Sequence, residues 1–303
     1  MLRSSARFQI LAAALLFSTG GAAIKLTALS SWQVASFRSA VAFLALLVML
    51  PEARRGWTWR SAAVGVAYAG ALICYAVANK LTTAASAIFL QSTAPLYIIV
   101  LGPWLLKEPN RRRDLALAGA LVLGLCLLFS DTCTATVTAP NPLAGNLLAA
   151  GAGLSWAFAV VGLRWMSRGG VESNHSAGPA VAIGNLIAFL VCLPMAFPME
   201  EYGAANDWLI IVFLGVLQIG LAYVFLTAGL RRITALEASL LLLVEPVLNP
   251  IWVWLTHGEV PGVRVLVGGL VIVTATAARV LSDRLFDDVE ENSVHLADDA
   301  GGV

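Results

Sequence analysis

The sequence predicts an all-α integral membrane protein, with ten transmembrane helices arranged as two inverted five-helix repeats and both termini cytoplasmic. Composition is the first observation behind this prediction, because 59% of the 303 residues are hydrophobic and 12% are charged. A soluble domain carries about 25% charged residues. The apolar residues also form long solid stretches, whereas strands of a membrane β-barrel alternate apolar and polar residues in runs of about ten. Helices that cross a bilayer are therefore expected.

The individual spans follow from length, because a helix needs about 20 apolar residues to cross a bilayer. The ten stretches of this kind cover residues 8–28, 32–50, 60–80, 84–106, 114–131, 143–166, 175–197, 207–229, 234–256 and 262–282. The first follows Met1-Leu2-Arg3 as in a signal peptide, but it is long enough to span. Its counterpart near residues 145–165 is internal and cannot be cleaved. We therefore expect the first stretch to remain as a membrane helix.

Internal repetition is the second observation. At an offset of 151 positions the matching pairs are Thr83 and Thr234, Pro95 and Pro246, Glu108 and Glu259, and Trp57 and Trp208. Each repeat holds five spans, an odd number, so the two repeats enter the membrane from opposite sides. Inverted repeats are typical of carriers that alternate between two states around a site near the midplane. We expect repeats at 1–131 and 132–282, followed by an acidic, disordered cytoplasmic tail at 283–303.

Basic residues fix the expected orientation. Of the 19 Lys and Arg residues, fifteen lie on the face of the N-terminus, Lys25, Lys80 and Arg264 lie on the opposite face, and Arg38 is inside a span. Loops rich in Lys and Arg stay in the cytoplasm. Both termini are therefore expected there. The net charge of +1 gives no reason to expect a nucleic-acid partner.

Polar side chains gather in six of the ten spans, and polar groups at membrane depth need partners or a water-filled cavity. We expect a substrate cavity lined from the first, third, fourth, sixth, eighth and ninth spans by Ser18, Thr19, Tyr75, Asn79, Gln91, Ser155, Trp156, Gln218, Tyr223 and Glu245. Tyr75 and Trp156 suit stacking against aromatic or large apolar cargo, or simple packing. The fifth and tenth spans are nearly featureless and carry small residues such as Gly268, so they are expected to be peripheral braces.

Two charged residues and two prolines stand out within the spans. Glu245 lies near mid-membrane, where a carboxylate is either protonated or paired. Its role is proton coupling or recognition of an ammonium group, or else bonding to the helix backbone beside Pro246. Arg38 could pair with a helix-end carbonyl, Glu245 or a substrate carboxylate, and the residues favour a structural pairing. Pro95 and Pro246 should kink their helices, either as bending points for gating or as static kinks.

Other functional classes find less support. An intramembrane enzyme needs a nucleophile, paired aspartates or metal ligands at membrane depth, but the three histidines lie at span ends or in the tail, and neither HExxH nor GxSxG occurs. The four cysteines lack metal-ligand or disulfide spacing, so no metal and no cofactor are expected. The sequence contains no filter-like segment that would indicate a channel or receptor. Because no ATP-binding motif is present, gradients would supply the energy.

Two stretches carry a resemblance to a known family. Residues 84–108 (AASAIFLQSTAPLYIIVLGPWLLKE) and 235–259 (ALEASLLLLVEPVLNPIWVWLTHGE) each place a proline midway and a glutamate at the end, and Phe37-Arg38 also fits. In these features the chain resembles the EamA-type ten-helix transporters of the drug/metabolite transporter superfamily. Within that superfamily it is similar to the YddG-type exporters of aromatic amino acids.

The resemblance implies a secondary transporter in a bacterial inner membrane. Such a protein would export aromatic or hydrophobic amino acids and related small metabolites by alternating access. The alternative within the same fold is a multidrug exporter of amphiphilic cations. The expected partners are a small-molecule substrate and the lipid bilayer, and the protein is expected to be a monomer or a homodimer.

Overall fold

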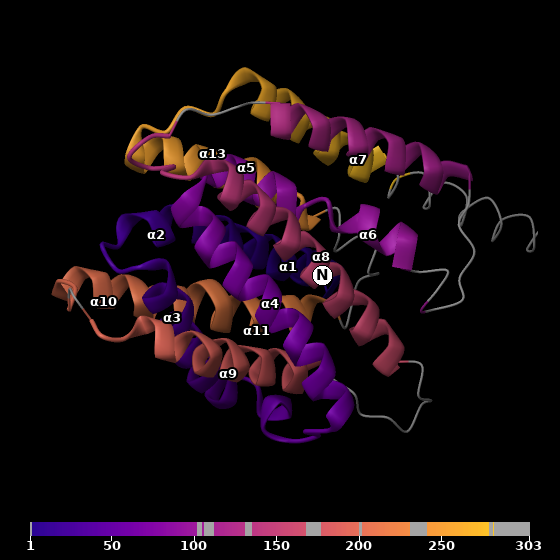
Figure 1. Ribbon diagram of the computed structural model, residues 1–303. Helices are drawn as coiled ribbons and strands as arrows, with labels where there is room; N and C mark the ends of the chain where they lie inside the picture. Colours follow the sequence, from indigo (N-terminus) through magenta and orange to yellow (C-terminus); the bar gives the residue numbers. More distant parts are fainter. Residues whose placement is uncertain are drawn as a thin grey trace, which may run out of the picture.

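The computed structural model describes residues 2–101, 105, 112–130, 135–167, 177–199, 202–230, 241–278 and 281. Within these residues the regular elements are helical, and the only β-type pairing is an isolated bridge between Thr136 and Ala139. Figure 1 shows the helices as a bundle. The predicted all-α fold class is confirmed. The predicted tail at 283–303 and Glu108 lie outside the described residues.

The described helices follow the chain in order. In the first half they are α1 (Leu2–Ser18), α2 (Gly20–Leu26), α3 (Ser31–Met49), the short 3₁₀ turn η1 (Pro51–Arg54), α4 (Trp59–Leu81), α5 (Ala84–Gln91), α6 (Ala94–Leu101) and α7 (Arg112–Ser130). In the second half they are α8 (Pro142–Ser167), α9 (Ala177–Ala196), α10 (Ala205–Val212), the π-helix η3 (Phe213–Leu221), α11 (Ala222–Leu230) and α13 (Val244–His257). A last helix covers Val263–Ala278.

These helices account for the predicted spans. Seven helical segments of the described chain are long and apolar enough to cross a membrane, and they match the first four spans and the sixth to eighth. The shorter apolar helices Asp114–Ser130 and Val263–Ala278 match the fifth and tenth spans. The ninth span is described from residue 241 onwards, mostly as α13. The chain is therefore a multi-pass membrane protein.

Short polar residues fix where several helices begin. The side chain of Ser30 accepts a hydrogen bond from the Gln33 amide at the start of α3, and Thr58 does the same for Ser61 at the start of α4. The side chains of Gln33 and Ser61 in turn accept hydrogen bonds from the backbone amides of Ser30 and Thr58, so both starts are capping boxes. A cap of this kind satisfies amide groups that the first helical turn leaves unpaired. The caps therefore set the ends of two neighbouring spans.

Three spans are broken rather than continuous. The first breaks at Thr19, between α1 and α2; the fourth breaks between α5 and α6; and the ninth is interrupted at Leu243, just before α13. Pro95 and Pro246 lie in the first turns of α6 and α13. Proline fits a first turn because its missing amide has no helical acceptor there. Both prolines thus follow a helix break, where a kink was expected from the sequence.

The two halves interlock instead of lying apart. Helix α4 packs against α8 and α9, α3 packs against α9 and η3, and α1 packs against α11 and α13. The last helix lies beside α7 along one edge of the bundle in Figure 1, where Gly124 and Gly268 face each other closely. Glycine permits this approach because it has no side chain between the two backbones. The interlocked arrangement leaves a cavity to which both halves contribute.

Candidate substrate-binding cavity

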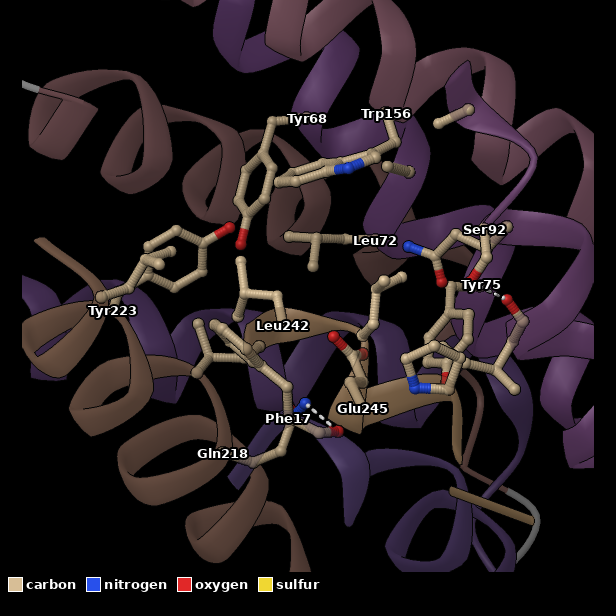
Figure 2. A pocket seen from close by; sticks show the side chains of 18 of the residues that line it. Phe17, Tyr68, Leu72, Tyr75, Ser92, Trp156, Gln218, Tyr223, Leu242 and Glu245 are labelled. Carbon is tan, nitrogen blue, oxygen red and sulfur yellow. Dashed lines mark hydrogen bonds between the residues drawn. The ribbon is translucent and has the colours of Figure 1, made fainter. Parts of the chain in front are cut away.

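A cavity of about 280 Å³ lies between the two halves, and Figure 2 shows its side chains from close by. Five aromatic residues line it: Phe17, Tyr68, Tyr75, Trp156 and Tyr223. Its polar lining consists of Arg38, Gln91, Ser92, Gln218, Glu245 and Thr276. The remaining lining is apolar. Such a composition, largely apolar with a few convergent polar groups, is typical of small-molecule sites.

Four of the aromatic residues form a chain of ring contacts. Tyr68 of α4 lies 6.1 Å from Trp156 of α8 and 5.8 Å from Tyr223 of α11, measured between ring centroids. Tyr223 in turn meets Phe17 of α1 edge to face, with centroids 5.4 Å apart. Edge-to-face pairs, such as those that Tyr223 forms with Tyr68 and Phe17, are among the preferred arrangements of aromatic rings. These four residues, named here the aromatic wall, therefore join helices from both halves on one side of the cavity (Figure 2).

Two buried asparagines form hydrogen bonds with Tyr75, one with its hydroxyl and one with its backbone carbonyl. Asn249 Nδ2 donates to the Tyr75 hydroxyl at 3.2 Å, and Asn79 Nδ2 donates to the Tyr75 carbonyl at 2.9 Å. Both asparagines are fully buried. Gly21 of α2 lies against their amides, and a β-carbon at this position would come within 2.7 Å of Asn249 Oδ1. The hydroxyl of Tyr75 is thus bonded by Asn249 of α13, and the small size of Gly21 leaves room for both amides.

Glu245 brings a carboxyl group into the cavity. It lies in the first turn of α13, and Figure 2 shows its side chain directed among the lining residues. An acidic side chain in this position interacts favourably with the helix dipole. Within the described residues no cationic side chain forms an ion pair with it. The carboxyl group is thus available to a ligand or to a proton.

Arg38 of α3 lines the same cavity although its side chain is 1% exposed. One terminal guanidinium nitrogen donates to the Leu72 carbonyl of α4 at 2.8 Å. The Nε atom has no hydrogen-bond partner in the described part of the chain. The pairing with a backbone carbonyl is therefore present, but Leu72 lies within α4 and not at a helix end.

The structure brings most of the expected site residues to the cavity. Six of the ten line it, namely Tyr75, Gln91, Trp156, Gln218, Tyr223 and Glu245, together with Pro95 and Pro246. Gln218 lies on the π-helix η3, an irregular element that often occurs at functional sites. The third, fourth, sixth, eighth and ninth spans therefore each bring at least one expected residue to the cavity.

Four expected residues lie outside the lining: Ser18, Thr19, Asn79 and Ser155. Ser18 Oγ donates to the Leu15 carbonyl and accepts from the indole of Trp252, while Thr19 Oγ1 donates to the Leu16 carbonyl. Helical Ser and Thr residues commonly satisfy their hydroxyls in this way. Asn79 Nδ2 donates to the backbone carbonyl of Tyr75, one turn earlier in α4. Ser155 lies against Gly70, where a β-carbon would come within 3.0 Å of its Oγ.

Several lining residues were not predicted from the sequence. Phe17 precedes Ser18 by one position. Tyr68 was not among the ten expected site residues, although the sequence places it on one helical face with Tyr75 and Asn79. Arg38 and Thr276 bring the second and tenth spans to the cavity, although the tenth was expected to be a peripheral brace. A search for polar groups alone overlooks apolar and aromatic walls.

Fold and cavity together define a multi-pass membrane protein that holds a partly polar site between two halves. A model of the EamA-like transporter family matches residues 4–130 and 143–280, and the chain therefore belongs to this family of transporters. The two matched segments fall within the two predicted repeats, whose boundaries stay predictions.

The comparison with solved structures supports the fold and nothing beyond it. A crystal structure described only as that of a protein is 21% identical and has a TM-score of 0.57, with 93% of this chain and 99% of the other chain covered. No curated protein matches the chain.

Proposed function

We propose that this transporter exports aromatic and hydrophobic amino acids, and related small metabolites, across a bacterial inner membrane by alternating access. The observation that supports this proposal is a cavity between the two halves in which an aromatic wall and the carboxyl group of Glu245 line the same space. The excess of basic residues on the face of the N-terminus supports cytoplasmic termini.

The aromatic wall suits a flat apolar side chain. Trp156 and the tyrosines Tyr68 and Tyr223 offer ring faces and edges, and a fourth ring from Phe17 extends the wall. An aromatic pair contributes about 0.5–1.5 kcal/mol beyond the area that it buries. A cargo with a phenyl or indole ring therefore gains more from this wall than an aliphatic cargo of equal size.

Glu245 gives the cavity a group that recognises a cation or carries a proton. A carboxylate inside a low-dielectric site binds an ammonium group through a short charge-assisted hydrogen bond. The ammonium of an amino acid meets this requirement, and so does an amphiphilic amine. A secondary transporter also needs a site for its coupling ion, and a carboxyl group in the cavity is suited to a proton.

The breaks in the spans support alternating access. Pro95 and Pro246, which occupy matching positions of the two repeats, both line the cavity, as do Gln91 and Leu243 beside the breaks. Broken helices at the interface of two repeats are a common feature of secondary transporters. Movement at the two breaks would change access to the cavity from one side and then from the other.

Counterflow tests this proposal directly. Purified protein is reconstituted into liposomes preloaded with unlabelled phenylalanine, and uptake of labelled phenylalanine is compared with uptake into empty liposomes. We expect uptake above this background that is inhibited by tryptophan but not by glutamate. Inhibition by amphiphilic cations together with weak competition from amino acids would indicate the multidrug alternative. Absence of uptake by demonstrably folded protein would refute the amino-acid proposal.

A further inference from the structure

We infer that Arg38 is a specificity-determining residue that binds the carboxylate of the cargo, so that the cavity selects zwitterionic amino acids over amines. This inference rests on the proposed function and deepens it, because it assigns the acidic end of the substrate to one side chain. It depends on the burial of Arg38, on the unused donors of its guanidinium and on its place in the same cavity as Glu245.

Burial is the first observation. The Arg38 side chain is 1% exposed and belongs to a membrane-spanning helix. A guanidinium in such surroundings requires a partner of opposite charge or a polar cavity. Among the described residues no carboxylate lies within ion-pair distance of it, and its ionisable neighbours are Tyr68, Tyr75 and Cys192. The described part of the protein thus holds a buried positive charge without a negative partner.

The donor geometry is the second observation. A guanidinium offers five N–H donors in a planar fork that fits the two oxygens of a carboxylate. One terminal nitrogen of Arg38 is used by the Leu72 carbonyl, at 2.8 Å. Nε is itself buried and has no partner in the described chain, and Arg38 is one of the residues that line the cavity. Leu72 therefore fixes the position of the guanidinium and leaves donors for a ligand.

Charge complementarity is the third observation. Arg38 of α3 and Glu245 of α13 line one cavity, yet they form no ion pair with each other. A cavity that offers a guanidinium and a separate carboxyl group matches a ligand with groups of both charges, and an α-amino acid at neutral pH is such a ligand. A simple amine would leave the guanidinium unpaired at a considerable cost. The aromatic wall would then receive the side chain of the amino acid.

A structural role is the competing explanation, because the contact with Leu72 also joins α3 to α4. Substrate selectivity separates the two roles. Counterflow of phenylalanine is measured with three competitors: phenylalanine, phenethylamine, which lacks the carboxylate, and 3-phenylpropionate, which lacks the ammonium. The variants are R38Q and R38K. The matched control is S39A, because Ser39 is the next residue of α3, is fully buried, does not line the cavity and has a hydroxyl without a partner in the described chain.

We expect wild-type protein and S39A to prefer phenylalanine over phenethylamine by about tenfold or more. In R38Q this preference should be lost, because phenylalanine binds about tenfold more weakly whereas phenethylamine binding changes by less than about twofold. R38K keeps the positive charge but lacks the planar fork of donors. Its preference for phenylalanine over phenethylamine should therefore lie between those of the wild type and R38Q. Equal losses for both ligands in folded R38Q, or unchanged selectivity, would overturn the inference.

Two further measurements apply if R38Q does not fold or if the wild-type protein does not transport phenylalanine. If R38Q does not fold, the wild-type comparison decides, and phenethylamine binding as tight as that of phenylalanine would overturn the inference. If the wild-type protein transports no phenylalanine, the proposed function fails by itself. Arg38 is then tested by thermal unfolding with 3-phenylpropionate. Stabilisation of the wild type but not of R38Q supports carboxylate binding, and equal or absent stabilisation refutes it.

Discussion

Lys25 Nζ lies 3.0 Å from Glu259 Oε2, and the two side chains are only 4% and 6% exposed. Lys25 also donates to the carbonyls of Thr82 and Thr138, and Glu259 Oε1 accepts the amide of Ala84 at 2.8 Å. The contact between Lys25 and Glu259 Oε2 is therefore a buried ion pair. This cluster joins α2, the start of α5 and the end of α13 at one end of the bundle.

Removal of one partner from this pair should destabilise the protein strongly. K25M leaves the Glu259 carboxylate buried without its cation, and such a loss costs about 3–5 kcal/mol in free energy of unfolding. We expect a clearly lower temperature of unfolding for K25M in detergent. The double variant K25M/E259M should recover much of the loss, because the pair is coupled. Strictly additive effects would show that the ion pair contributes nothing specific.

Trp156 should be required for transport. Its ring meets Tyr68 within the aromatic wall, so W156A removes both a ligand surface and the support of a neighbouring ring. We expect phenylalanine counterflow to fall by about tenfold or more. Trp254 supplies the matched control, because it is 54% exposed and does not line the cavity. Normal flux in folded W156A would remove this residue from the site, and equal losses in W254A would indicate general damage.

Glu245 should determine the pH response of transport. Glutamine cannot lose or gain a proton in the physiological range, so E245Q removes titration while keeping a side chain of the same shape. If this carboxyl group carries the coupling proton, counterflow by E245Q becomes independent of pH between about pH 5 and 8, and uptake driven by a proton gradient is lost. Q218A is the control, because Gln218 also lines the cavity but carries no charge. A pH response retained in E245Q would assign coupling to another group.

The sequence predicts the spans well because a bilayer imposes a length and a composition on every helix that crosses it. It also predicts convergence on a site, since Glu245 and Gln218 are costly at membrane depth unless they face a cavity. The helix break at Thr19 is harder to predict, because no proline follows it within the same span and the break depends on packing in three dimensions. Composition also gives no sign of the π-helix η3.

Two of the predicted cavity residues that lie outside the lining share a physical reason. Ser18 and Thr19 satisfy their hydroxyls on carbonyls of their own helix, an option that the sequence does not distinguish from exposure to a cavity. Conversely, Phe17 is apolar. Its presence in a membrane span carries no desolvation cost, so the sequence does not indicate that it lines a cavity. The connection of Glu259 to Lys25 was not foreseen either. Glu259 contacts residues far away in the sequence, and local sequence patterns do not reveal such contacts.

The glycines at the edge of the bundle should differ sharply in their tolerance of a methyl group. A β-carbon at Gly268 would lie 2.9 Å from the Gly124 carbonyl oxygen, a backbone atom that cannot move without shifting α7. Overpacking of this kind costs about 1–3 kcal/mol, so G268A should lower the unfolding temperature. A β-carbon added at Gly119 of α7 would meet no described atom within 4 Å, and G119A should leave the unfolding temperature unchanged or slightly raised.

Thermal unfolding of both variants in the same detergent checks this contrast. G268A as stable as G119A would mean that α7 and the last helix do not pack closely through Gly124 and Gly268. Counterflow adds a functional readout, because the last helix also contributes Thr276 to the cavity. A G268A variant that unfolds earlier and also transports more slowly would therefore show that the packing of this helix supports the site.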